Sequence, residues 1–212
     1  MVLCIDTSTN ILDIAIKDEI EGSVIDSLTA DYGKTHSEVL MPKIDEMLAN
    51  NNLKIADVTL IIVTIGPGSY TGLRIGMATA QGLARGIKSA ACNSVTQPNI
   101  HGVSSLTLLA RCVAESPQKW LGAKNTEIIP YIDARNGAVF ASVCTVAPNS
   151  NLSDKIDFTS SPAIRIDFEE LKNAHPNAYF ADYSKFINTK WNYLNKNDLT
   201  DTQIIYAGKQ WG

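Results

Sequence analysis

The sequence lacks the features that mark several classes of protein. It contains neither a basic leader with an apolar signal stretch at its N-terminus nor any apolar run longer than the eight residues Val58–Ile65. A helix that crosses a bilayer needs about 20 apolar residues, so neither export nor a membrane location is expected. The four cysteines also lack the C-x-x-C spacing of zinc or redox sites, and we expect buried, reduced thiols of a cytosolic protein. These cysteines are Cys4, Cys92, Cys112 and Cys144.

Paired histidines and an excess of positive charge are missing as well. His36, His101 and His175 lie far apart, which excludes a metal site built from two histidines on one helix. The formal net charge is -4, from 18 Lys+Arg against 22 Asp+Glu, so the chain offers no strongly basic surface for a polyanion. With 212 residues, 45% of them hydrophobic, the chain is long enough for one large α/β unit or two lobes. No metal or cofactor is predicted.

Short apolar runs separated by turn residues predict strands. Val2–Asp6, Ile11–Ile16 and Ser23–Leu28 are such runs, and the polar reversals between them favour an antiparallel meander. The pattern of a strand, a turn that begins with Asp, and a second strand recurs around Asp133, 127 positions after Asp6. This recurrence suggests that half of the chain is a duplicate of the other half.

The segment from His36 to Asn50 has the apolar spacing of an amphipathic helix. Apolar residues recur every three or four positions, and the run ends at consecutive asparagines. Pro42 lies inside the pattern, so the helix either starts near Glu38 or is kinked at the proline. The following run, Val58–Ile65, is typical of a strand buried on both faces.

A glycine-rich segment follows that strand and opens a helix to about Lys88. It is not a P-loop, because Leu73 follows the glycine where a lysine is needed, and it is not G-x-G-x-x-G, because Thr71 occupies the third glycine position. Its backbone N–H groups could bind an anion, or its glycines could allow unusual φ angles and close contacts. The residues of this motif loop are Gly66, Pro67, Gly68, Ser69, Tyr70 and Thr71.

The helix after the motif loop carries small residues at every fourth position. Gly72, Gly76, Ala80 and Ala84 therefore share one smooth face, which allows another backbone to approach closely. The smooth face is either a tight contact within the chain or an interface with another molecule. The helix His36–Asn50 is the expected companion, and together the two would form a two-helix platform.

Few residues suggest catalysis. Asp6 and Asp133 could hold Mg²⁺ and phosphates in a cleft between lobes, or each could simply bond its own backbone in a turn. Ser69 lacks the G-x-S-x-G spacing, so a hydrolase triad has no support.

Five blocks of the sequence, in order, resemble the TsaB (YeaZ) family. The glycine-rich block Gly66–Gly76 is the most specific of them, and the resemblance extends from residue 3 to about 143. From Ala147 onward only Ile204, Ile205 and Tyr206 match, so that third is assigned by continuity. The other four blocks are Leu3–Ser8, His36–Pro42, Gly102–Leu106 and Ile132–Gly137.

The resemblance implies a cytoplasmic α/β protein of the actin-like, sugar kinase and Hsp70 (ASKHA) fold with two related lobes, here residues 1–106 and 107–212. It implies a non-catalytic scaffold subunit that pairs with TsaD, and then with the ATPase TsaE, in threonylcarbamoylation of the adenosine next to the anticodon of tRNAs that read codons beginning with A. The chain would have no cofactor and would meet tRNA only through the complex. Without its partner, it could form a homodimer through the same face.

The family's pairing surface maps onto the two predicted helices. We therefore expect Gly76→Leu or Ala80→Trp to weaken pairing with TsaD while the fold stays intact. The expected interface residues are His36, Leu40, Ile44, Met47, Gly72, Leu73, Ile75, Gly76, Thr79 and Ala80.

An enzyme remains the alternative, either a nucleotide-dependent ASKHA phosphotransferase or a glycoprotease-like metallopeptidase. The sequence also departs from the family in two places. Tyr70 stands where phenylalanine is common, and the stretch Lys88–Asn99 is a few residues longer than usual, which indicates a longer surface loop.

Overall fold

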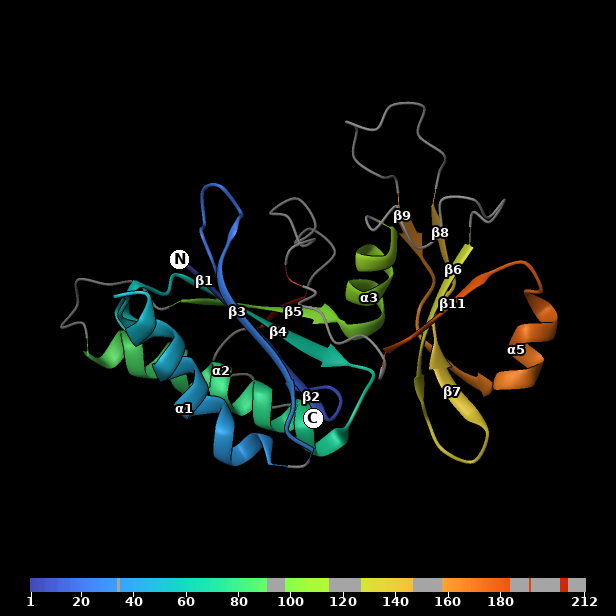
Figure 1. Cartoon of the computed structure of the whole chain (residues 1–212), viewed down its shortest axis with the longest axis horizontal. Helices are drawn as coiled ribbons and strands as arrows, with labels where there is room; N and C mark the ends of the chain where they lie inside the picture. The colour runs from blue at the N-terminus through green and yellow to red at the C-terminus, as the bar shows by residue number, and fades with distance from the viewer. Residues whose placement is uncertain are drawn as a thin grey trace. The chain divides into compact units, whose positions relative to one another are not determined.

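The computed structural model of the chain (Figure 1) describes residues 1–33, 35–90, 98–114, 127–146, 158–183, 191 and 203–205. The chain divides into two compact units, one of Met1–Ser105 with Ile187–Gly212 and one of Leu106–Phe186. From the resemblance, all of residues 107–212 were expected in the second lobe. Instead the end of the chain groups with the first unit, where β12 (Gln203–Ile205) pairs with β5 (Asn99–Ser104).

The first unit is built on a six-stranded sheet in the order β12-β5-β4-β1-β2-β3. The strands not yet given are β1 (Val2–Asp6), β2 (Ile11–Lys17), β3 (Val24–Asp31) and β4 (Leu60–Gly66). The first three form the predicted antiparallel meander, and β4 and β5 extend the sheet in parallel with β1. All residues of β1 and β2 are buried, because both faces of the sheet are covered.

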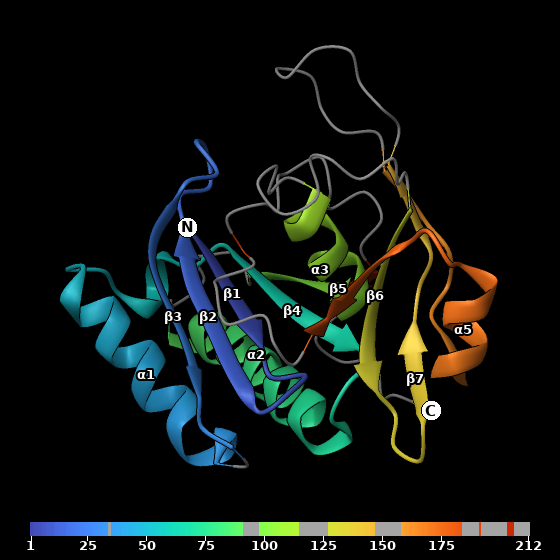
Figure 2. The same cartoon turned by 45° about the vertical axis from the view of Figure 1, so that its right-hand side comes forward.

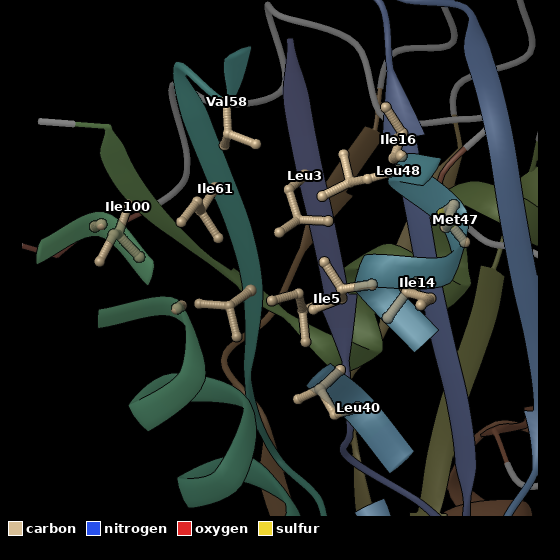
Figure 3. Close-up of a cluster of buried hydrophobic side chains, with 14 of the residues drawn as sticks. Leu3, Ile5, Ile14, Ile16, Leu40, Met47, Leu48, Val58, Ile61 and Ile100 are labelled. Atoms are coloured by element: carbon tan, nitrogen blue, oxygen red, sulfur yellow. The ribbon is translucent and has the colours of Figure 1, made fainter. Parts of the chain in front are cut away.

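Two helices, α1 (His36–Asn50) and α2 (Tyr70–Ala90), lie side by side on one face of this sheet (Figures 1 and 2). A short 3₁₀ helix (Ile55–Asp57) leads from α1 into β4. Leu3 and Ile5 of β1 point toward the helices and pack with Leu40 of α1 (Figure 3). The predicted amphipathic helix is confirmed, and it begins at His36 with the exposed ring of Pro42 inside it. Within the described residues, no helix is long and apolar enough to cross a membrane.

Trp191 covers the opposite face of the same sheet. Its side chain is fully buried, and its indole N–H donates to the Asp13 carbonyl oxygen at 3.3 Å. The buried Lys17 ammonium donates to the Trp191 carbonyl at 2.6 Å, and the Thr29 hydroxyl donates to the Asp13 carboxylate at 3.0 Å. A residue near the end of the chain thus makes hydrogen bonds with buried polar groups of β2.

Cys4 lies on this face too, where burial raises the pKa of its thiol to about 12. Cys4, Cys112 and Cys144 are buried free thiols, as expected. Cys92 lies outside the described residues.

The second unit repeats the strand order of the first. Four of the six strands of its sheet run β10-β7-β6-β11, with two antiparallel pairs and then a parallel pair, as in β3-β2-β1-β4. Of the other two, β8 pairs with β6 and β9 pairs with β8. Helix α5 follows β10 as α1 follows β3. This agreement supports the predicted duplication. The elements are α3 (Ser105–Ala114), β6 (Glu127–Asp133), β7 (Ala138–Ala141), β8 (Cys144–Val146), β9 (Phe158–Ser160), β10 (Ile164–Asp167), α5 (Phe168–Ala174) and β11 (Tyr179–Asp182).

The small-residue stripe of α2 is a contact within the chain. Gly72, Gly76, Ala80 and Ala84 are all buried. A Cβ atom at Gly72 would overlap the carbonyl oxygen of Thr7, and one at Gly76 would overlap the Thr7 hydroxyl. The expectation that this stripe is kept free for a partner is therefore wrong: glycine is required because the first hairpin turn lies directly against the helix.

We predict that Gly76→Ala lowers the free energy of unfolding by about 1–3 kcal/mol, because the added methyl group forces α2 away from Thr7. Gly82→Ala is the matched control, since a Cβ there meets nothing within 4 Å and the change raises stability by about 0.4–1 kcal/mol. Urea denaturation followed by circular dichroism measures both. Equal effects of the two substitutions would contradict the packing described, and Gly76→Leu should be worse than Gly76→Ala.

We also predict that Trp191→Ala lowers the free energy of unfolding by about 3–5 kcal/mol, because it leaves a large cavity and removes the cover from Lys17. Ile20→Ala is the control, because that side chain is 89% exposed and its loss should cost less than about 0.5 kcal/mol. The same denaturation experiment applies. A Trp191→Ala protein as stable as the Ile20→Ala protein would show that the end of the chain is dispensable for the first unit.

Candidate functional site

The motif loop packs against the first hairpin turn. The Ser69 N–H donates to the Ser8 carbonyl at 2.7 Å, and the Thr7 hydroxyl donates to the Gly72 carbonyl at 2.8 Å. A side chain at Gly68 would collide with Ser8, and Gly66 has a φ of +105° that favours glycine. The glycines thus serve close contact and unusual φ angles, the second of the two interpretations, and the chain's own backbone occupies the space beside the loop.

Asp6 is held inside this contact. Its side chain is buried, and one carboxylate oxygen, Oδ1, accepts from the Ser8 N–H at 2.9 Å, the Ser8 hydroxyl at 2.6 Å and the Thr64 hydroxyl at 2.9 Å. The first of these bonds is the predicted turn bond to its own backbone. The carboxylate therefore joins β1, the hairpin turn and β4.

Asp133 makes the same turn bond in a different setting. Its carboxylate accepts from the Arg135 N–H at 2.8 Å, but the residue is exposed. Side chains alternate between the two faces of a strand. Asp133 is therefore on the same face of its sheet as Ile129, which packs on α5. Asp6 is on the face of its sheet opposite to the one that packs on α1. The two aspartates therefore occupy non-equivalent faces of the repeated sheets, so the repeat does not supply a matched pair of carboxylates. Among the described residues, no group of three or more His, Cys, Asp or Glu side chains is arranged to hold a metal ion.

Most of the expected interface residues are part of the chain's own core. Leu73, Ile75 and Thr79 are only half-buried, and they alone remain partly accessible. The other expected interface residues are buried, so their side chains cannot contact a partner and the expectation is wrong for them. The reason is that apolar spacing identifies the inner face of a helix, not its outer face. The buried residues are His36, Leu40, Ile44, Met47, Gly72, Gly76 and Ala80.

The outward faces of the two helices differ in charge. On α1 the outward charged residues include Glu38 and Asp45, while Lys43 forms an ion pair with Glu46 at 2.6 Å. The exposed thioether of Met41 lies among them. Helix α2 has 21 residues, and all of its charged residues are cations. Its outward face is therefore basic. These cations are Arg74, Arg85 and Lys88.

An open groove of about 490 Å³ lies between the end of β4 and the first half of α2. Tyr70 is 74% exposed at its edge, and the Arg74 guanidinium donates to the Tyr70 hydroxyl at 3.2 Å. Sequence analysis named Tyr70 and Leu73 but missed the rest of this surface, which the spacing of residues 70, 74, 77, 78 and 81 along a helix could have revealed. The lining residues are Thr64, Ile65, Tyr70, Leu73, Arg74, Met77, Ala78 and Gln81.

Two sequence expectations fall partly outside the described residues. The longer loop predicted between Lys88 and Asn99 contains residues 91–97, which are not described. Ile204 and Ile205 lie in β12, whereas Tyr206 is not described.

Comparisons with known proteins agree with the resemblance. Residues 23–157 match the family model described as "TsaD: tRNA N6-adenosine threonylcarbamoyltransferase". The chain is 34% identical over 141 residues to the tRNA threonylcarbamoyladenosine biosynthesis protein TsaB of Haemophilus influenzae, covering 66% of this chain and 52% of that protein. It is 35% identical over 146 residues to TsaB of Bacillus subtilis, covering 67% and 54%. The chain thus spans about half the length of these curated relatives.

A solved structure shares the fold. YeaZ from Pseudomonas aeruginosa superposes with a TM-score of 0.59 at 22% sequence identity, covering 78% of this chain and 67% of that one. The expected α/β fold of the ASKHA type with two related lobes is confirmed. The family model covers more than half of the chain, and the chain therefore belongs to the TsaD family of tRNA threonylcarbamoyladenosine proteins, and within it to the TsaB (YeaZ) members.

Proposed function

We propose that the chain takes part in tRNA threonylcarbamoyladenosine biosynthesis as a non-catalytic scaffold that pairs with TsaD, and with TsaE in a larger complex. Family membership carries this proposal, because both the family model and the curated relatives are named for this modification. In this role the protein is cytoplasmic, has no cofactor and reaches tRNA only through the complex.

The state of Asp6 and of the motif loop supports a role without catalysis. A phosphotransferase of this fold needs carboxylate oxygens for Mg²⁺ and open backbone N–H groups for phosphate. Asp6 instead uses Oδ1 to hold three donors, and the Ser69 N–H is bonded to Ser8. A glycoprotease-like activity needs a metal. His36, which lies in the block His36–Pro42 that resembles the family, is buried within the fold. The interactions at both places are structural.

The outward surfaces of α1 and α2 are the proposed docking face for TsaD. The two helices lie together on one side of the sheet (Figure 2). Their outward residues are exposed or half-buried. Met41 is the apolar centre of the α1 surface, and Ile75 and Thr79 contribute from α2. The same face serves a homodimer when TsaD is absent, because the acidic face of α1 complements the basic face of α2 in a two-fold arrangement.

Sedimentation velocity of the mixed proteins tests the pairing. We expect the wild-type chain to co-sediment with TsaD, and Met41→Arg to raise the dissociation constant about tenfold or more, because it places an extended cation at the centre of the contact. Ile20→Arg is the matched control: it makes the same change at an exposed residue of the β2–β3 turn and should bind as wild type. Failure of the wild-type chain to bind TsaD would refute the scaffold role, whereas normal binding by Met41→Arg would refute only the assigned face.

Calorimetry separates the scaffold from the enzyme alternative. Titration of the chain alone with ATP and Mg²⁺ should give no saturable heat and no turnover. Micromolar binding together with ATP hydrolysis by this chain would instead establish a phosphotransferase-like enzyme.

A further inference from the structure

The groove beside Tyr70 adjoins the outward face of α2 and has an apolar lining of its own. Ile65, Leu73 and Met77 form apolar walls, and Arg74 is the only charged residue among the lining residues that the structure describes. Tyr70 lies at the edge of the groove and is largely exposed. Such exposure is unusual for a large aromatic side chain in a protein with a hydrophobic core. Tyrosine and arginine are the residue types that most often anchor protein interfaces.

The exposed face of α2 continues the groove with positive charge. Tyr70, Arg74, Gln81, Arg85 and Lys88 are spaced by three, four or seven residues and therefore lie along one side of the helix. No carboxylate forms an ion pair with any of these three cations in the part of the chain that the structure describes.

Arg74 contacts Tyr70 at the mouth of the groove. Its guanidinium is 5.3 Å from the centre of the Tyr70 ring and donates to the hydroxyl of that residue at 3.2 Å. The tyrosine thereby restricts the arginine side chain at the mouth of the groove, and a guanidinium retains further N–H donors for a carboxylate. Less conformational entropy is lost on binding when the side chain is restricted beforehand.

We infer that this groove binds a short segment of a partner protein in which an apolar side chain, such as phenylalanine, is flanked by carboxylates. The apolar side chain enters between Leu73 and Met77, and the carboxylates meet Arg74 and the cations farther along α2. A polynucleotide fits less well, because its phosphates gain nothing from apolar walls and the chain as a whole carries a charge of -4. Arg74, Arg85 and Lys88 also lie on the proposed docking face, so the inference rests on the proposed function and adds the ligand chemistry of that face. The test below uses the chain without TsaD, so failure of the inference and failure of the scaffold role can be told apart.

Methionine methyl groups offer a direct test. The sequence contains four methionines, of which Met77 lines the groove, Met41 is exposed on α1, and Met47 is buried. The full chain, labelled with ¹³C at the methionine methyl groups, is titrated with a pentapeptide that has a central phenylalanine between two pairs of glutamates. We expect a saturable shift of the Met77 resonance, with those of Met41 and Met47 unchanged.

Three variants, one of them a control, and three further probes complete the experiment. Arg74→Gln and Tyr70→Ala should each weaken binding at least fivefold, while Arg165→Gln, the same charge change at an exposed residue of the second unit, should leave it unchanged. Peptides with lysines for the glutamates, or alanine for the phenylalanine, should not shift Met77, and neither should a uridine dodecamer. Equal response to the lysine peptide, a response to the RNA alone, no Met77 shift with the glutamate peptide at millimolar concentration, or normal binding by Arg74→Gln would each overturn the inference.

Discussion

The close contact between the first hairpin turn and helix α2 is the constraint on which the first unit depends. Thr7 lies directly over Gly72 and Gly76, and its hydroxyl donates to the Gly72 carbonyl. This contact fixes the distance of α2 from β1 and brings the motif loop against Ser8, where the Ser69 N–H finds its acceptor. The glycines that cost helix stability in isolation are thus required by tertiary packing. The position of α2 then determines both its outward face and the groove at the end of β4.

Local patterns predicted the elements whose stabilising interactions are also local. The apolar spacing from His36 to Asn50 gave a helix with those bounds, and the alternation of apolar runs and turn residues gave the meander of β1 to β3. The turn bonds of Asp6 and Asp133 followed from the chemistry of a short carboxylate side chain beside its own backbone. In each of these cases the sequence pattern and the interaction that satisfies it lie within a few residues.

Interactions between distant residues were not predictable in this way. Lys17 and Trp191 are 174 positions apart, and no periodicity links them, so the return of the chain end to the first unit could not be inferred. The stripe from Gly72 to Ala84 did predict close approach, but a smooth helix face has the same spacing whether it packs on its own sheet or on another molecule. The error about the interface residues has the same origin, because apolar periodicity selects the buried side of a helix. The exposed side of a helix is indicated instead by the charged residues between the apolar positions, and apolar periodicity takes no account of them.

Charge segregation makes the helical surface selective despite the small net charge of the chain. A charge of -4 spread evenly over 212 residues would guide no partner, because fields of mixed sign cancel within a Debye length of about 8–10 Å. On this chain the carboxylates of α1 and the cations of α2 occupy adjacent helices, so a partner on the proposed docking face would meet an acidic and a basic strip side by side. A surface of this kind attracts a partner whose basic and acidic strips face the acidic and basic strips of the two helices. It repels a partner whose strips place like charges opposite one another. The buried apolar faces give the helices their positions, and the outward charges therefore remain free to specify what docks there.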